Sequence, residues 1–346
     1  MHLEENKPLA PLTTLGVGGP ARYFLEARSE EEILEGSAWA RKHEIPLFIL
    51  GGGSNLVIAD KGFDGLVLHV ALRGVEAAED SHMDQALFRT AAGEDWDGFV
   101  QRAVEADCAG IECLAGIPGS VGGTPVQNVG AYGQEVASVI DRVRVFDLRE
   151  RFFAEFSEAE CGFAYRRSRF SASDKGRYIV TRVDFMLQRN GSPMLKYADL
   201  QSSFAPDAKP MLAEVAAAVR RIRRSKGMLL VEGDADCRSA GSFFKNPVVP
   251  AQALEGIATA AGKAPPAFDA GPEQRKIPAA WLIEQAGFTK GYSHGAAGIS
   301  SRHALAIINR GGATAAEILA LAEEIRAEVL ARFGVQLEME PVLAGF

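Results

Sequence analysis

The chain has 346 residues, of which 47% are apolar and 24% charged, a composition typical of a folded protein with two or three domains. Its net charge of −8 excludes the basic surface that nucleic-acid and membrane-surface proteins need, so we expect neither kind of partner. The amino-terminal MHLEENKP is acidic and polar, so we expect no signal peptide, and no apolar run is long enough to span a bilayer.

The four cysteines are widely separated and show no CxxC spacing. They are Cys108, Cys113, Cys161 and Cys237, and no pair of histidines lies near them. This pattern favours free thiols in a reducing cytoplasm over a disulfide framework or a metal site. We therefore expect a cytoplasmic protein without a bound metal.

The first glycine loop lies between two predicted strands. Ser29 and Glu32 form a capping-box pattern that begins a helix. A buried strand at 46–50 leads into GGGSN at 51–55, and a second strand follows at 56–58. A dinucleotide fingerprint needs a strand, a glycine loop and then a helix, so this order excludes a Rossmann domain. The P-loop pattern GxxxxGK[ST] is also absent from the sequence.

The next segment predicts strands around one amphipathic helix. Residues 62–92 predict short strands, and further strands are expected at 139–147 and 178–188. Residues 94–107 predict a helix whose apolar and aromatic side chains recur on one face. Such a face favours packing into the core over contact with a cofactor.

A second glycine-rich segment, GIPGSVGGTPVQNVGAYG, occupies residues 116–133. It holds six glycines in eighteen positions. Glycine lets a backbone approach a ligand closely, and a run of free N–H groups can line an anion-binding concavity. Together with residues 51–55, the segment predicts a large phosphate-bearing ligand. Two tight structural turns remain the alternative.

The composition changes near residues 200–230, which predicts a domain boundary. A helix expected at 210–224 ends in four arginines, and the helix dipole favours cations there. A loop follows at 227–241. The remaining expected elements are a short helix at 279–286, a strand at 304–309 and a long helix from 314 to 333.

Ser242, in AGSFFKNP, is the first candidate for chemistry. It fits a nucleophile, a proton donor or a turn residue. The SxxK pattern that it begins needs SDN and KTG companions to indicate an acyltransferase, and both are missing. YRRSRF at 165–170 gathers arginines around aromatics, and LEMEP at 337–341 carries two carboxylates. No local argument joins Arg166, Ser242 and Glu340.

Seven motifs in chain order resemble those of the UDP-N-acetylenolpyruvoylglucosamine reductase family, in its longer class with a substrate-binding tyrosine loop. They cover nearly the whole chain. The motifs are TTLGVGGPARYF (13–24), GGGSN (51–55), GIPGSVGGTPVQNVGAYG (116–133), FAYRRSRF (163–170), GSFFKNP (241–247), AAWLIEQAGFTKGYSHGAAGISSRHALAIINRGGAT (279–314) and FGVQLEMEP (333–341).

The resemblance implies an α+β fold. An FAD-binding domain of the vanillyl-alcohol oxidase and p-cresol methylhydroxylase type would span 15–187, with two subdomains split near residue 70. A connecting segment with the substrate loop would span 188–225. A smaller α/β substrate domain would span 226–346, its last residues packing back on the active site. Relatives that attach flavin covalently use a histidine in the first glycine loop, and residues 51–55 contain none. We therefore expect non-covalent FAD.

The resemblance also implies a reaction. NADPH reduces FAD, the enolpyruvyl UDP-sugar then takes the place of NADP, and hydride passes from flavin N5 to C3 of the enolpyruvyl group. Arg166 and Glu340 would stabilise the negative charge that develops, and Ser242 would protonate C2. Because an ionised Glu340 would repel an enolate, a protonated carboxyl that donates a hydrogen bond is the form we expect.

Binding residues follow from the same resemblance. Tyr197 and Lys226 match contacts to the substrate diphosphate, and Tyr165 and Asn246 match other residues of the substrate pocket. Lys226 is followed by Gly-Met-Leu-Leu where relatives often have Leu-Pro, and Pro341 stands where valine is common. The expected FAD contacts are Gly51, Gly52, Gly53, Ser54, Asn55, Gly119, Ser120, Gly122, Gly123, Thr124, Gln127 and Asn128.

Three other functions stay open. One is a different FAD-dependent oxidoreductase or oxidase on the same fold. Another is a non-catalytic protein that binds flavin or a nucleotide sugar. A serine acyltransferase is the third. Since no dimerisation element is visible, we expect a monomer.

Overall fold

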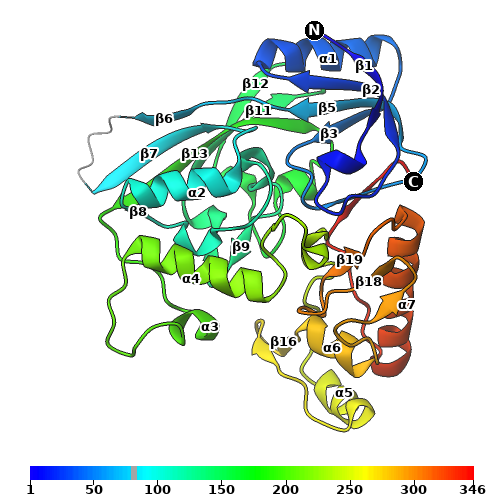
Figure 1. Ribbon diagram of the computed structural model, residues 1–346. Helices are drawn as coiled ribbons and strands as arrows, with labels where there is room; N and C mark the ends of the chain where they lie inside the picture. The colour runs from blue at the N-terminus through cyan, green and yellow to red at the C-terminus, as the bar shows by residue number, and fades with distance from the viewer. Residues whose placement is uncertain (79–83) are drawn as a thin grey trace. The chain divides into compact units, whose positions relative to one another are not determined.

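The computed structural model describes residues 1–78 and 84–346, and these form two compact units (Figure 1). The first unit comprises Met1–Lys7, Ala21–Gly53 and Asp64–Arg224. The second comprises Pro8–Pro20, Ser54–Phe63 and Ser225–Phe346. The chain therefore crosses between the units more than once before Arg224. Of the strands expected within 62–92, the stretch 79–83 lies outside the described residues.

The first unit contains a four-stranded and a six-stranded sheet. The four-stranded sheet has the order β1 (Glu4–Pro8), β2 (Pro20–Ala27), β5 (Phe63–Val70), β3 (Leu47–Leu50). The six-stranded sheet has the order β12 (Phe153–Ser157), β11 (Ile140–Asp147), β13 (Tyr178–Arg189), β7 (Gln85–Ala91), β6 (Val75–Ala78), with β8 (Cys108–Ala109) also paired to β13. The expected strands are confirmed here as β3, β11 and β13.

The helices of the first unit begin at side-chain caps. Ser29 accepts a hydrogen bond from the Glu32 N–H and begins α1 (Glu30–Lys42), while the Glu32 carboxylate accepts from the Arg28 N–H. Asp95 caps α2 (Trp96–Glu105) in the same way through the Gly98 N–H. Both predicted helices are confirmed. The short α3 spans Ala198–Gln201 and the expected arginine-rich helix is α4 (Leu212–Ser225). In Figure 1, α2 and α4 lie on the same side of the six-stranded sheet.

Aromatic side chains join α2 to the six-stranded sheet. The rings of Trp96 and Phe99 on α2 lie 5.8 and 5.0 Å from the ring of Phe185 on β13. Trp96 and Phe99 are only 1% and 2% exposed. The apolar face of the helix therefore belongs to the core, as its periodicity predicts.

The second unit has small sheets around one long helix. Its strands are β4 (Leu56–Ile58), β14 (Val248–Pro250), β15 (Phe268–Asp269), β16 (Gln274–Lys276), β17 (Ser293–His294), β18 (Ala297–Ile299), β19 (Ile307–Asn309) and β20 (Val342–Ala344). Its helices are α5 (Ala253–Ala261), α6 (Ala279–Gln285) and α7 (Ala315–Phe333). The buried side of α7 packs on these elements through Ile318, Leu321, Ile325 and Val329.

The amino-terminal part of the chain is tied into the second unit at two points. β4 pairs in parallel with β20, although nearly the whole sequence separates them. The Asp60 carboxylate accepts hydrogen bonds from the Ala315 and Ala316 N–H groups, at 2.7 and 3.0 Å. The first N–H groups of α7 have no acceptor within the helix, and Asp60 supplies one for these two. Thr314 and Glu317 form a complete capping box at the same end.

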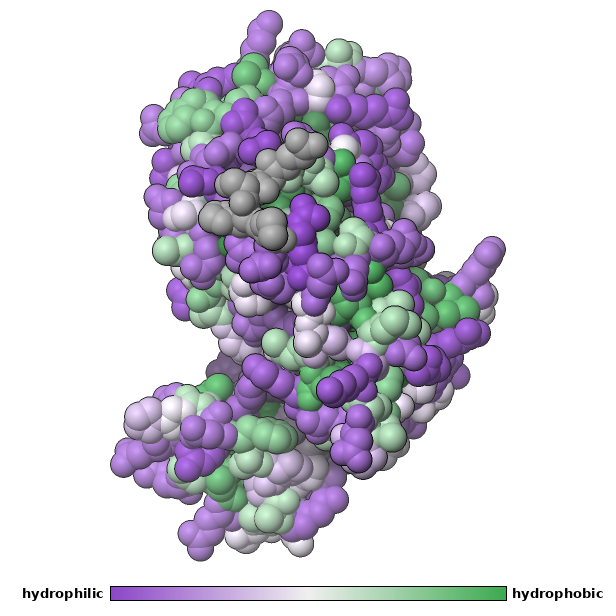
Figure 2. All heavy atoms as spheres, turned by 90° about the vertical axis from the view of Figure 1, so that its left-hand side faces the viewer, coloured by the Kyte–Doolittle hydropathy of each residue, from purple (hydrophilic) through white to green (hydrophobic). Residues whose placement is uncertain are grey.

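The view in Figure 2 shows hydrophilic side chains over most of one face, with hydrophobic atoms in patches between them. Among the described residues, the structure contains no helix that is both long and apolar enough to cross a membrane.

A buried carboxylate at the end of β11 makes stability depend on pH. Asp147 accepts two hydrogen bonds from Arg177, at 2.7 and 2.9 Å, and others from the Arg149 and Glu150 N–H groups. Burial alone would raise the pKa of Asp147, but these hydrogen bonds outweigh burial and hold the pKa below its ordinary value. The stabilisation is complete above the unfolded-state pKa of about 4 and is lost as pH falls through the folded-state value.

We expect Asp147→Asn to lower the free energy of unfolding at pH 7, and the gap to wild type to shrink as the pH is lowered from 5 to 3. Urea unfolding at each pH measures this. The control is Asp64→Asn, which removes an 86% exposed carboxylate paired with Arg22 and should change stability little at any pH. A gap for Asp147→Asn that is independent of pH would contradict the assignment.

Candidate active site

The two glycine loops of the first unit are packed directly against each other. The Gly52 N–H donates to the Ser120 hydroxyl at 3.2 Å. A Cβ atom at Gly52 would lie 2.5 Å from both the Gly119 Cα and the Ser120 nitrogen, and one at Gly51 would lie 2.9 Å from the Ser120 hydroxyl. Only glycine fits such a backbone-to-backbone contact. Residues 51–53 and 119–120 are therefore packed into one surface, on which the predicted ligand would lie.

The second glycine loop is held at its first residue. The Gly116 N–H donates to the Asp97 carboxylate at 2.5 Å, and the Gly116 carbonyl accepts from the Arg223 guanidinium at 3.0 Å. Arg220 forms a bidentate pair with the same Asp97 carboxylate. Burial lowers the pKa of Arg223. Tertiary contacts of Arg220 and Arg223 thus add to the helix dipole that we invoked for the arginines of α4.

This surface fits the diphosphate of FAD. Gly51 and Gly52 leave the backbone open to a ligand, and a side chain at Gly52 would meet backbone atoms of the second loop. The other expected FAD contacts differ in what they offer. The buried Thr124 hydroxyl donates to the Val121 carbonyl at 2.7 Å, and the Ser54 carbonyl accepts from Thr14.

Arg166 lies in a tight turn of the first unit. Ala164 and Arg167 exchange backbone hydrogen bonds at 2.9 and 3.1 Å, which places Tyr165 and Arg166 at the tip. Arg166 has a φ of +51°, a conformation that costs a non-glycine residue about 1–3 kcal/mol and that clusters at functional sites. Its guanidinium donates to the Asn128 and Gly130 carbonyls and lies over the Tyr165 ring.

Ser242 and Glu340 are brought together in the second unit. The Glu340 N–H donates to the Phe243 carbonyl at 2.9 Å, the Lys245 N–H donates to the Glu338 carbonyl at 3.0 Å, and Phe244 forms a bridge with Met339. The two expected catalytic residues therefore lie on adjacent antiparallel segments. No local sequence pattern predicts this pairing, because about a hundred residues separate the segments.

Asn55 fixes the segment that carries Glu340. Its amide donates to the Glu340 carbonyl at 3.2 Å, and its own carbonyl accepts from the Val342 N–H at 3.0 Å. The end of the first glycine loop thus holds the backbone on the carboxyl-terminal side of Glu340. This is a structural use of Asn55 in addition to the cofactor contact that the resemblance implies.

The expected substrate residues are in two settings. Tyr165 and Tyr197 in the first unit are 42% and 46% exposed, and the Tyr197 ring lies edge-on to Tyr132 at 5.5 Å. In the second unit, Lys226 precedes Gly227, which has a φ of +64°. The Asn246 side-chain oxygen accepts from the Ala279 N–H at 2.9 Å and caps α6. This bond fixes the orientation of the Asn246 side chain and leaves its amide nitrogen to donate to a ligand.

A buried carboxylate that the sequence analysis missed anchors the segment before Tyr197. Glu112 is fully buried and accepts from the Met194 N–H at 2.9 Å and from the Gln134 amide at 2.7 Å. The Cys113 thiol donates to the Met194 carbonyl at 3.2 Å. Met194 is thereby held through both of its backbone groups. The only signal in the sequence is a glutamate among apolar residues, which does not by itself predict a partner.

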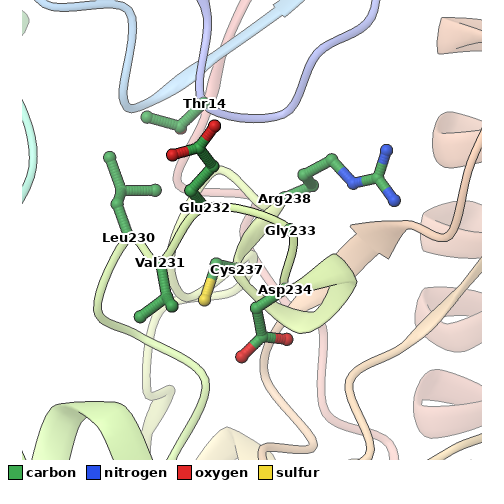
Figure 3. Close-up of a pocket in the computed structure, with 8 residues that line it drawn as sticks. All are labelled: Thr14, Leu230, Val231, Glu232, Gly233, Asp234, Cys237 and Arg238. Carbon is green, nitrogen blue, oxygen red and sulfur yellow. The ribbon is translucent and has the colours of Figure 1, made fainter.

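The expected loop at 227–241 lines a pocket of about 400 Å³ in the second unit (Figure 3). Thr14 adds to the pocket from the amino-terminal segment, and Glu232 and Asp234 give it acidic walls. Asp234 is paired with Arg302. Figure 3 shows the Arg238 guanidinium extending away from Leu230 and Val231. The Cys237 thiol donates to the Leu229 carbonyl at 2.7 Å, and burial raises its pKa, so it is a poor nucleophile.

The fold and the paired glycine loops define an FAD-binding protein, and a family model described as an FAD binding domain matches residues 21–151. The chain belongs to the UDP-N-acetylenolpyruvoylglucosamine reductase family, because proteins of that name are 46% and 47% identical to it over 98% of its length. The model of that family's C-terminal domain matches residues 233–344. The α+β fold with these two domains and the expectation of FAD are thereby confirmed.

Similar proteins match nearly the whole chain. The UDP-N-acetylenolpyruvoylglucosamine reductase of Streptomyces coelicolor is 47% identical over 98% of this chain and 89% of its own length. That of Thermobifida fusca is 46% identical over 98% of this chain and 97% of its own. The crystal structure of UDP-N-acetylenolpyruvylglucosamine reductase from Thermus caldophilus matches 99% of both chains with a TM-score of 0.68 and 28% identity.

We expect Gly52→Ala to abolish or strongly weaken FAD binding, because the added methyl group meets backbone atoms of residues 119 and 120 that cannot move independently. The measurements are the flavin absorbance per chain after purification and the FAD dissociation constant of the apoprotein. Gly256→Ala is the matched control, because a Cβ at this helical glycine meets nothing within 4 Å. Full FAD binding by Gly52→Ala would show that the loop contact is not needed.

Proposed function

We propose that this chain reduces UDP-N-acetylglucosamine enolpyruvate to UDP-N-acetylmuramate, using electrons that NADPH delivers through bound FAD. The observation that carries the proposal is family membership over the full length of the chain. It is supported by the presence of Arg166, Ser242 and Glu340 in the family's three catalytic motifs.

FAD, when bound, accepts hydride from NADPH and passes it to the substrate. The residues that would hold its diphosphate are those of the paired glycine loops, Gly51–Gly53 and Gly119–Ser120. Gly122, Gly123 and Gln127 of the second loop would complete the site, with Ser54 and Asn55 following the first. Since residues 51–55 offer no histidine, the cofactor is held without a covalent bond.

Arg166 would stabilise the negative charge that develops on the substrate carboxylate as hydride arrives at C3. A guanidinium does this best when its direction is fixed before the charge appears. Carbonyl acceptors at Asn128 and Gly130 fix one side of the group. The positive φ of Arg166 is a cost consistent with such a functional constraint.

Ser242 would donate the proton that C2 requires. The side chain follows Gly241, whose φ is +77°, and precedes two phenylalanines that are at most 1% exposed. The buried rings hold the backbone of Ser242 in place. A hydroxyl is a weak acid in water, but a strongly basic centre within hydrogen-bond reach lowers the acidity that is needed.

Glu340 would act as a neutral hydrogen-bond donor to the same developing charge. An ionised carboxylate there would raise the barrier by repulsion. Its backbone is fixed by Phe243 on one side and by Asn55 on the other. Both contacts fix the backbone position of Glu340, and this position determines which part of the site its carboxyl group can contact.

The nucleotide-sugar substrate is an anion, and the chain carries a net charge of −8. Local cations must therefore outweigh the overall field. Lys226 and Tyr197 would bind the diphosphate, and Tyr165 and the amide nitrogen of Asn246 would bind other parts of the substrate.

We further propose a cytoplasmic monomer, with free cysteines that fit a reducing compartment. The functional division would be 15–187, 188–225 and 226–346. The change of compact unit at Arg224 supports the last boundary, while residues 8–20 and 54–63 add to the second unit in the structure.

Anaerobic half-reactions test the proposed function. The protein is first reduced with NADPH and then mixed with UDP-N-acetylglucosamine enolpyruvate while the flavin spectrum is followed. We expect bleaching and then return of the oxidised spectrum. Bleaching without return would move the assignment to another FAD-dependent oxidoreductase, and rapid return with oxygen alone would favour an oxidase.

We expect Ser242→Ala to retain flavin reduction by NADPH and to lose at least about a hundredfold in the rate of reoxidation by the substrate, because only the second half-reaction needs the proton. Stopped-flow absorbance measures both rates. Equal losses in the two half-reactions would rule out the proton-donor role.

Glu340→Gln and Glu340→Ala separate hydrogen-bond donation from carboxylate chemistry. A glutamine can still donate from its amide, so we expect Glu340→Gln to reoxidise at least about tenfold faster than Glu340→Ala. If the two variants are equally slow, the role of Glu340 depends on its ionisation, and the neutral-donor proposal fails.

A further inference from the structure

We propose that Asn128, with Glu135, is a positioning residue for Arg166 and not a direct ligand of FAD. This inference rests on the role of Arg166 proposed above. Asn128 lies just before a small hairpin formed by β9 (Gly130–Ala131) and β10 (Gln134–Glu135). It is 1% exposed, so its polar atoms must be satisfied inside the protein.

The side chain of Asn128 is fully engaged as a donor. Its amide nitrogen donates to the Glu135 carboxylate at 2.9 Å and to the Ala164 carbonyl at 3.1 Å. Its side-chain oxygen accepts from the Ala137 N–H at 3.2 Å. Because an asparagine amide has two N–H donors, neither is left for a cofactor. The glycine loop's last expected FAD contact therefore has a different task.

These bonds connect the two pieces of backbone that define the position of Arg166. One is the turn at 164–167, which carries Arg166 and is held through the Ala164 carbonyl. The other is the segment 128–130, whose carbonyls accept from the Arg166 guanidinium. The Asn128 side chain thus connects the turn that carries the Arg166 backbone to the segment that holds the Arg166 guanidinium.

The backbone around Asn128 and Arg166 adopts strained conformations that only the surrounding contacts can maintain. Asn128, Tyr132 and Arg166 are three of the nine non-glycine residues with positive φ among those described. Gly130 is also constrained, because a Cβ there would lie 2.7 Å from the Glu135 Cγ and 3.1 Å from the Arg166 guanidinium. Such strain persists only where surrounding contacts over-determine it, and the Asn128 amide supplies several of them.

The consequence is specific to one half-reaction. If Asn128 acts through Arg166, its loss misplaces the guanidinium and slows hydride transfer to the substrate, while flavin reduction by NADPH keeps its rate. Misplacement of a catalytic group by about 1 Å can cost on the order of a hundredfold in rate.

A double-mutant cycle tests this. The variants are Asn128→Ala, Arg166→Ala and the double variant, with FAD content and both half-reaction rates measured. We expect Asn128→Ala to keep its FAD and to slow reoxidation by about 10- to 100-fold. In the Arg166→Ala background the same change should alter the rate by less than about twofold, since residues that act as a unit are not additive. Asn6→Ala is the matched control, because Asn6 is an exposed asparagine with a φ of +53°.

Other results overturn the proposal. Loss of FAD from Asn128→Ala would make the residue a cofactor ligand, and equal slowing of both half-reactions would make it purely structural. Full reoxidation by Asn128→Ala while Arg166→Ala is slow would reject this inference alone. Full reoxidation by Arg166→Ala would instead reject the proposed role of Arg166, and this inference with it.

A second pair of variants decides the matter if Asn128→Ala does not fold. Glu135 is only partly buried, so its replacement is better tolerated. Glu135→Ala removes one acceptor of the Asn128 amide and should slow reoxidation by several-fold, whereas Glu135→Gln keeps an acceptor and should restore the rate. Wild-type reoxidation by Glu135→Ala would refute the positioning role.

Discussion

The contact between the two glycine loops is the constraint on which the rest of the first unit depends. Gly52 lies so close to Gly119 and Ser120 that even a methyl group would meet backbone atoms. The loops come from distant parts of the chain, so every element that positions either of them serves this contact. Asp97 and Arg223 hold Gly116 by both of its backbone groups, and α2 and α4 supply those two side chains. Arg220 and Arg223 of α4 therefore help to hold the second glycine loop.

The same logic applies to the catalytic candidates. The Arg166 guanidinium donates to the remote carbonyls of Asn128 and Gly130, and the Glu340 N–H donates to the carbonyl of Phe243, the residue after Ser242. Asn55 has two roles, because it ends the first glycine loop and also holds the backbone on the carboxyl-terminal side of Glu340. These contacts hold the Arg166 guanidinium and fix the backbone from which the Ser242 and Glu340 side chains extend.

Elements with strong local signals were predictable. The Thr314 and Glu317 capping box correctly begins α7, and the aromatic periodicity of 94–107 correctly assigns Trp96 and Phe99 to the core. The strand after GGGSN excluded a Rossmann domain, and β4 confirms that strand. Predictions that considered only residues close in the sequence missed contacts with distant parts of the chain. The dipole argument for α4 missed Asp97, and nothing local indicated that Asn246 caps α6.

The sequence by itself determined the helices α1, α2, α4, α6 and α7, the strands β3, β4, β11 and β13, the glycine loops and, through ordered motifs, the family and its cofactor. These are properties of short segments, in which periodicity, caps and glycine spacing act within a few residues. It did not predict α3, α5 or most of the short strands. Only the tertiary structure decided which side chains meet. It placed the segment of Ser242 beside that of Glu340, and it joined the buried Glu112 carboxylate to the Met194 N–H. It also joined the Asn128 amide to the turn that carries Arg166. Hydrogen bonds between residues far apart in the chain leave no periodic trace in the sequence, because each depends on the folding of everything between its partners.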